Sequence, residues 1–161
     1  MVRAKVLTKD LVKLDFHGID KWTAIERLVD VVVQSTQDAD RQAVLSAVIE
    51  RERSGSTALH NGIAVPHART DGVPHLVAAA GISREGIDFE SGDGHSAGQR
   101  CHFILLILAP PAESTRYLKA LAAVAALGQD LNALDALKNA TTPEEGFSIF
   151  EGIRGLNLVQ I

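Results

Sequence analysis

The residue of this chain best placed to do chemistry is a histidine that directly follows a proline. His67 ends the run Asn-Gly-Ile-Ala-Val-Pro-His, which begins at Asn61. Asn61-Gly62 is a turn signal, and Pro66 removes a backbone donor and disfavours helix at the residue before it. We therefore expect His67 at a constrained surface turn after a short apolar segment. A neutral imidazole held there could act as a nucleophile or proton carrier, although a histidine beside a proline is more often an ordinary loop residue.

Other kinds of site find less support in the residue spacing. His60, His67 and His75 include no pair at the helical i, i+4 spacing of a zinc-binding helix, and we expect neither a metal nor a cofactor. The chain has neither a Gly-x-Ser-x-Gly nucleophile elbow nor a glycine-rich phosphate loop ending in Lys-Ser/Thr. Its single cysteine, Cys101, is expected to be a small buried hydrophobe.

Composition sets limits on the partners. The 161 residues are 46% hydrophobic and 22% charged, with a formal net charge of −4 and 4% aromatic residues. Nucleic acid is a poor partner for such a chain, because it requires clustered positive charge or aromatic stacking platforms. The longest apolar run, 103–111, is far too short to span a bilayer, and the N-terminus has no signal-peptide pattern. We expect one cytoplasmic domain over residues 1–161, without membrane insertion.

The first half of the chain predicts two helices. Asp20 is placed to cap the first, and Asp38 to cap the second. The first helix has an apolar face at helical spacing, made of Trp22, Ile25, Leu28, Val29 and Val32. The second ends in the charged run 50–53, which contains Arg51 and is normally a solvated helix end.

The second half predicts strands followed by helices. Strands are expected at 76–82, 86–89 and 101–108, with a loop at 91–98. A helix capped by Ser114 or Thr115 should end near Gly128, a short one should cover 131–138, and Thr142 should cap a last one. This order predicts an α/β domain with a mixed β-sheet and helices on both faces, in three layers.

The motif around His67 resembles a known family. Gly55-Ser-Thr57 followed by the run from Asn61 to His67 is similar to the active-site signature of the enzyme IIA components of the bacterial phosphotransferase system. The branch is the fructose–mannitol type, which includes nitrogen-regulatory proteins. The two early helices, the apolar strand ending in Pro110-Pro111 and the helix after it follow the family order over nearly the whole chain.

This resemblance implies a phosphoryl carrier. His67 would accept phosphate from the histidine-containing phosphocarrier protein, and would pass it to a IIB component or have its state sensed by a regulatory target. Arg51 would stabilise the phosphoryl group, because a guanidinium can hold phosphoryl oxygens bidentately. The turn at the phosphate site would contain Thr57, Asn61 and Gly62.

One position departs from the family pattern. Many relatives carry a second active-site histidine early in the helix after the apolar strand, where this chain has Tyr117. A phenol can donate a hydrogen bond to phosphate or imidazole but cannot supply the same proton chemistry. The difference favours a regulatory over a sugar-transferring role. The alternative hypothesis is a partner-binding sensor module that keeps the fold without phosphate turnover.

Overall fold

The chain folds around a mixed β-sheet, and the computed structural model describes residues 6–14, 16, 20–89 and 99–152 of it. Within these residues the sheet has five strands: β1 (Val12–Lys13), β2 (Ile63–Ala64), β3 (His67–Arg69), β4 (Val77–Phe89) and β5 (Gln99–Ala109). β4 and β5 form a long antiparallel pair at its centre. β1 runs parallel to β4, and β2 and β3 both run parallel to β5 along its other edge.

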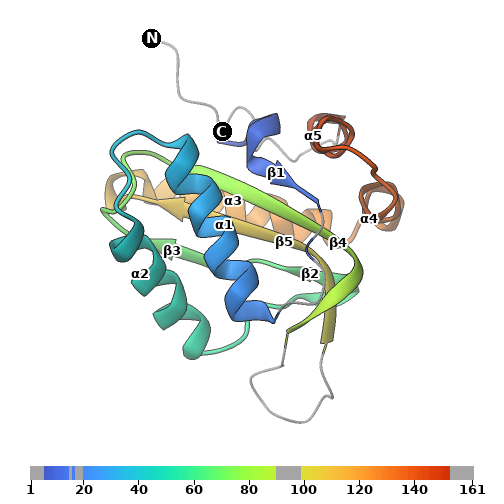
Figure 1. Ribbon diagram of the computed structural model, residues 1–161, viewed down its shortest axis with the longest axis horizontal. Helices are drawn as coiled ribbons and strands as arrows, with labels where there is room; N and C mark the ends of the chain where they lie inside the picture. Colours follow the sequence, from blue (N-terminus) through green and yellow to red (C-terminus); the bar gives the residue numbers. More distant parts are fainter. Residues whose placement is uncertain (1–5, 15, 17–19, 90–98, 153–161) are drawn as a thin grey trace.

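Helices cover both faces of this sheet. They are α1 (Lys21–Ser35), α2 (Arg41–Arg53), α3 (Ser114–Leu127), α4 (Leu131–Lys138) and α5 (Pro143–Gly152). α1 and α2 cross the face that is in front in Figure 1, whereas α3 runs behind the sheet. α4 and α5 follow on the right of that view, where α4 contacts β4 and α5 contacts β1. This arrangement confirms the predicted α/β fold.

The centre of the sheet forms the core. Each residue of β5 from Phe103 to Ala109 is at most 3% exposed, as expected for a strand covered on both faces. Cys101 is fully buried, and burial raises the pKa of its thiol to about 12. The prediction that it is a buried hydrophobe is therefore confirmed, because a thiol so rarely ionised is a poor nucleophile.

The helix starts are partly as predicted. Asp20 caps α1 by accepting a hydrogen bond from the backbone N–H of Thr23 at 2.7 Å. The prediction that Asp38 caps α2 is wrong: Asp40 is the cap, and Asp38 lies in the preceding turn with φ of 66°. Asp40 is two residues nearer the helix than Asp38, so its carboxylate can reach the free N–H groups of the first turn of α2. Asp38 instead forms part of the turn between the two helices.

Two further details differ from the predictions. Neither Ser114 nor Thr115 caps α3, because the 3₁₀ turn Pro111–Glu113 leads into it and the cap position is Glu113, without a side-chain cap bond. Trp22, expected on the buried face of α1, is 38% exposed.

The two predicted strands 76–82 and 86–89 form one strand. β4 continues through a register shift between Ile82 and Ile87, where Gly86 has φ of 84°. Such an irregularity bends a strand without ending its pairing. The predicted loop 91–98 lies outside the described residues.

The fold brings one end of β3 to the start of α3. β2 and β3 pair with successive parts of β5, and Val65 and Pro66 separate them. The carbonyl of Pro66 accepts a hydrogen bond from the N–H of Ile107 at 3.1 Å, so the chain stays on the sheet although proline has no donor. His67 begins β3 beside the apolar strand that leads to α3.

Candidate functional site

His67 is half-buried at the first position of β3. In that strand Ala68 points into the core, and His67 and Arg69 lie on the opposite, more exposed side. The imidazole is therefore held by a strand of the sheet, where the sequence predicted a surface turn.

The hydrogen bond of the imidazole identifies its protonated nitrogen. Nδ1 of His67 lies 2.6 Å from the carbonyl oxygen of Val65. A carbonyl oxygen can only accept, so Nδ1 must carry the hydrogen. In the neutral ring the lone pair is then on Nε2.

Burial favours this neutral ring. The pKa of His67 is lowered from its ordinary value of 6.5, first because burial penalises the charged form and also because Arg51 is near. The hydrogen bond to Val65 and the charge of Glu52 act in the opposite direction. The net effect keeps the imidazole neutral and nucleophilic at pH 7.

Arg51 lies at the end of α2 and shares two hollows with His67. The larger, of about 600 Å³, is also lined by Arg69, Tyr117 and Leu118, and the smaller, of about 240 Å³, by Thr57. Nη1 of Arg51 donates to the carbonyl of Gly55 at 3.0 Å, which holds the guanidinium at this side of the helix end. The structure thus brings together Arg51 and His67, which are 16 positions apart in the sequence.

Arg69 is a residue of the site that the sequence analysis did not single out. Its guanidinium carbon lies 5.9 Å from the ring centroid of Tyr117, and its Nη1 lies 3.4 Å from the hydroxyl of Ser114. The signal was its position two residues after His67, because such residues share one face of a strand.

Tyr117 lies beside the imidazole. The two ring centroids are 6.1 Å apart and the rings are tilted by 53°, an ordinary separation for an aromatic pair. The side chain is 5% exposed, and burial raises the pKa of its phenol, which stays protonated at neutral pH. The helix after the apolar strand therefore does bring Tyr117 to His67.

The three residues predicted for the phosphate-site turn are placed differently from one another. Thr57 lines the smaller hollow, but its hydroxyl donates to Glu52 at 2.7 Å. Asn61 donates from its amide to the carbonyl of Gly128, at the end of α3, at 2.7 Å. Gly62 has φ of 80°, and a Cβ on it would lie 3.3 Å from the ring of His102. Asn61 and Gly62 thus shape the turn, and neither lines the hollows beside His67.

Glu52 is the second residue of the site that sequence reasoning missed. Its side chain is fully buried, accepts two hydrogen bonds from Thr57 and pairs with Lys21. The charged run 50–53 suggested a solvated helix end, and its composition does not show that Glu52 is the buried carboxylate. Glu52 is buried because the start of α1 packs against the end of α2.

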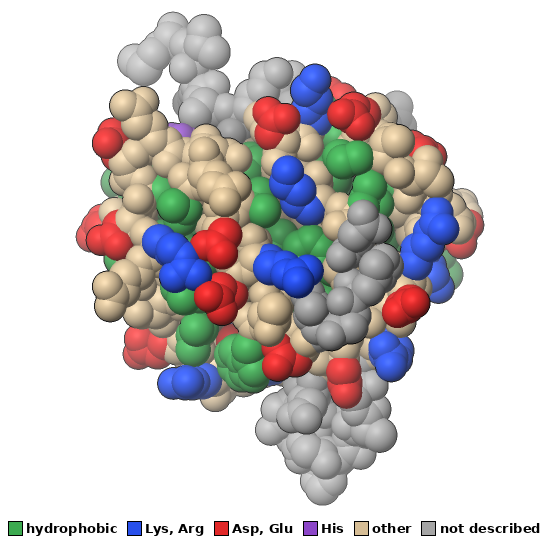
Figure 2. Space-filling view, viewed as in Figure 1, with side chains coloured by type: hydrophobic (Ala, Val, Ile, Leu, Met, Phe, Trp, Pro, Cys, Tyr) green, Lys and Arg blue, Asp and Glu red, His purple; other side chains and the backbone are tan. Residues whose placement is uncertain are grey.

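The described residues contain no candidate metal centre. Within them, no group of three His, Cys, Asp or Glu side chains could hold a metal ion. On the face that α1 and α2 cover, positive and negative side chains are interspersed (Figure 2). None of the helices of the described chain is long and apolar enough to cross a membrane.

Comparison with known proteins identifies the class. Residues 5–152 match the family model described as "Phosphoenolpyruvate-dependent sugar phosphotransferase system, EIIA 2". The chain belongs to this family, which confirms the resemblance of the motif and makes the chain a phosphoryl carrier of this system.

Three curated relatives carry the names of both branches. The fructose-specific EIIA component of Haloferax volcanii is 36% identical over 71% of this chain and 72% of the relative. The nitrogen regulatory protein of Pseudomonas aeruginosa is 27% identical over 92% and 95%. The fructose-specific EIIABC component of Bacillus subtilis is 35% identical over 76% of this chain, which spans only 19% of that longer protein.

Solved structures share the fold. The nitrogen regulatory protein IIA-Ntr of Neisseria meningitidis superposes with a TM-score of 0.78, at 24% identity over 89% of this chain and 95% of that one. Enzyme IIA of the Escherichia coli mannitol system, in complex with phosphorylated enzyme IIB, gives 0.72 at 21% identity over 91% and 98%.

Proposed function

We propose that the phosphoryl group is carried on Nε2 of His67. The observation that carries this proposal is the 2.6 Å hydrogen bond from Nδ1 to the carbonyl of Val65, because it leaves the lone pair on the other nitrogen. That nitrogen belongs to a half-buried, neutral ring beside two open hollows, with Arg51 lining both.

The transfer needs no proton acceptor. The lone pair of Nε2 attacks phosphorus, and the phosphorus–nitrogen bond on the donor imidazole breaks as the new bond forms. The donor leaves with the electron pair, and His67 becomes a phosphoimidazolium that keeps its hydrogen on Nδ1. The carbonyl of Val65 then faces a positive ring, which strengthens their hydrogen bond. Catalysis consists of positioning and charge stabilisation, as in other phosphoryl transfers.

Arg51 and Arg69 supply the positive charge. Both line the larger hollow beside His67, so both can approach oxygens of a phosphoryl group on Nε2. Two guanidinium groups in a partly closed site stabilise the charge of the transferred group more than they would in water. Tyr117 adds a hydrogen-bond donor at the position where many relatives have a second histidine.

The donor we propose is the histidine-containing phosphocarrier protein, in the cytoplasm. The acceptor is a IIB component, or a regulatory target that senses the phosphorylated state. Names of both kinds occur among the relatives. Tyr117 favours regulation, since a neutral phenol can donate one hydrogen bond but cannot become the cation that a second imidazole can place beside a phosphoryl group.

The test is phosphoryl uptake from phosphoenolpyruvate. The chain is incubated with enzyme I and the phosphocarrier protein, and its intact mass is measured. We expect one phosphoryl group on the parent chain and on His75→Ala, whose imidazole bonds the carbonyl of Leu76 away from the hollows, and none on His67→Ala. Uptake by His67→Ala would assign the acceptor elsewhere. No uptake by the parent chain would favour the non-catalytic sensor module.

A further inference from the structure

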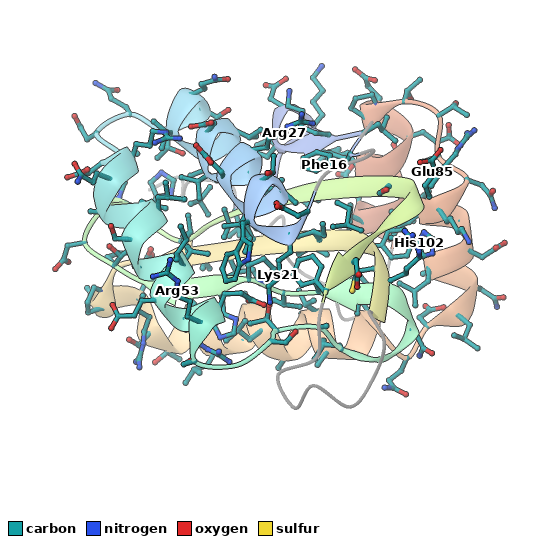
Figure 3. The ribbon with its side chains drawn as sticks, turned by 60° about the horizontal axis from the view of Figure 1, so that its bottom comes forward. Phe16, Lys21, Arg27, Arg53, Glu85 and His102 are labelled. Atoms are coloured by element: carbon teal, nitrogen blue, oxygen red, sulfur yellow. The ribbon has the colours of Figure 1, made fainter. Side chains whose placement is uncertain are left out.

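A buried ion pair joins the start of α1 to the end of α2 directly behind the candidate site. Nζ of Lys21 lies 3.3 Å from Oε1 of Glu52, and the two side chains are 12% and 0% exposed. Figure 3 shows Lys21 at the first turn of α1, on the side of the molecule where α2 ends. The ammonium also lies 4.8 Å from the ring centroid of Trp22 and 5.7 Å from that of Phe89.

The carboxylate of Glu52 uses both oxygens to hold one residue of the loop after α2. Oε1 accepts from the backbone N–H of Thr57 at 3.1 Å, and Oε2 accepts from its hydroxyl at 2.7 Å. Burying a carboxylate is costly unless a cation and several donors satisfy it, and Lys21 and Thr57 together do so here. Thr57 is thus clamped at two points.

Hydrogen bonds continue from this clamp to the imidazole. The carbonyl of Thr57 accepts from the backbone N–H of Val65 at 3.1 Å. The carbonyl of the same Val65 accepts from Nδ1 of His67 at 2.6 Å. Each link is a direct contact, so a displacement of Thr57 moves the carbonyl that orients the ring.

We propose that Lys21 and Glu52 are positioning residues for His67. Through Thr57 and Val65 they hold the imidazole with its hydrogen on Nδ1 and its lone pair on Nε2, facing the hollows. This inference rests on the proposed function for its consequence, the rate of phosphoryl uptake. The orientation itself is a property of the unphosphorylated chain.

A second ion-pair group between the same helices provides the comparison. Arg41 pairs with Glu26 at 2.8 Å and with Asp30 at 2.6 Å, and these side chains are 41–54% exposed. No hydrogen bond in the described structure connects them to the loop that leads to His67. If Lys21 and Glu52 merely fastened α1 to α2, disrupting either group would leave the imidazole unchanged.

The experiment compares Glu52→Gln and Lys21→Met with the control Glu26→Gln. The ring ¹⁵N shifts of His67 report which nitrogen is protonated, and phosphoryl uptake and the free energy of unfolding are measured on the same proteins. In Glu52→Gln the amide oxygen takes the place of only one carboxylate oxygen, and the amide nitrogen cannot accept the hydrogen bond that the other oxygen receives from Thr57. Thr57 is then held less firmly, and so is the Val65 carbonyl that orients the ring. We expect a mixture of ring tautomers and uptake slowed roughly tenfold or more, since small displacements of a reacting group are costly.

Lys21→Met keeps the inference testable if Glu52→Gln does not fold. We expect it to shift the tautomer in the same direction by a smaller amount, and Lys21→Arg, which keeps the cation, to restore the parent value. Glu26→Gln should match the parent chain in both readouts. Parent-like tautomers and uptake in both Glu52→Gln and Lys21→Met would overturn the inference. If the parent chain takes up no phosphoryl group, the proposed function fails, but the ¹⁵N comparison still decides this inference.

Discussion

The two ends of the Asn61–His67 motif perform different tasks. At its start, Asn61 has φ of 67° and donates to the carbonyl of Gly128, while Gly62 packs its open Cα side against His102. At its end, Pro66 directly precedes β3, and His67 lines the hollows together with Arg51. The first end holds the loop against the rest of the domain, and the second presents a nucleophile.

The residues of a short sequence motif therefore need not all lie at the functional site. Seven consecutive residues suggest that all of them surround the phosphate, yet the left-handed residue Asn61 is hydrogen-bonded to the end of α3. The charged partner of His67 comes from α2 instead, ten positions before the motif starts. Substitutions at the two ends should therefore separate stability from chemistry.

The largest effect is expected at the chemical end, on Arg51. Arg51→Gln removes a guanidinium from both hollows, and we expect phosphoryl uptake to slow about a hundredfold, the usual cost of losing one strong charge-stabilising donor. The free energy of unfolding should change by less than about 1 kcal/mol, because the lost contacts are partly exposed. Mass spectrometry of samples quenched at successive times measures the rate of uptake, and urea denaturation measures the free energy of unfolding.

Arg69→Gln sharpens this comparison. It keeps the strand and removes the second guanidinium, which lies over the ring of Tyr117. We expect a slower uptake than in the parent chain but a smaller defect than in Arg51→Gln. If Arg51→Gln takes up the phosphoryl group at the parent rate, Arg51 has no role in the transfer and is an ordinary charged residue at a helix end.

At the structural end, Asn61→Ala should act on stability alone. It removes the amide donor to Gly128 and places a Cβ-bearing residue without a local hydrogen bond in the left-handed region, at a cost of about 1–3 kcal/mol. Asn61→Gly keeps the backbone relaxed and loses only the amide, so its cost should be smaller. Uptake per folded molecule, with the folded fraction taken from circular dichroism, should equal the parent value in both. A specific loss of uptake would place Asn61 in the phosphoryl site after all.

The sequence predicted those parts of the molecule that follow from local patterns. The apolar run to Leu108, the cap at Asp20 and the helix 131–138 appear where periodicity and capping place them. The resemblance singled out His67 and Arg51, and the fold brings both to one hollow. The order of the strands comes from non-local pairing, which no local pattern contains.

What escaped prediction depends on packing. Asp38 and Asp40 are equally good caps by residue type, and only the turn geometry between α1 and α2 selects the second. Glu52 is indistinguishable in sequence from the exposed Glu50, because its burial results from the approach of Lys21 and Thr57. The protonated nitrogen of His67 also required the position of one carbonyl, that of Val65.

Substitutions of Tyr117 test whether a residue of α3 contributes to phosphoryl transfer at His67. Tyr117→Phe keeps the buried ring but removes its hydroxyl, and loss of one hydrogen bond of about 1 kcal/mol would slow uptake about fivefold. Tyr117→His should restore the two-histidine arrangement and change the transfer rate with little loss of stability. If both variants transfer phosphate at the parent rate, the difference from many relatives is neutral, and the case for regulation loses its support.

The smallest effect, on stability against pH, separates the two ends once more. Neither Asn61 nor Gly62 titrates, whereas His67 has a pKa lowered by burial in the folded chain and near the ordinary 6.5 when unfolded. As pH falls through 6.5 the unfolded chain takes up a proton on this ring before the folded chain does. The contribution of neutral His67 to stability is therefore complete above that value and is lost as pH falls toward the lowered folded pKa.

His67→Gln removes this one titration. We expect the difference in unfolding free energy between the parent chain and His67→Gln to shift against the parent on going from about pH 7.5 to about pH 5.5. Denaturant titrations at the two pH values measure it. A constant difference would mean that the imidazole is not desolvated in the folded chain. The ring would then be partly protonated near pH 6, and uptake would fall with acidity earlier than a buried, neutral nucleophile allows.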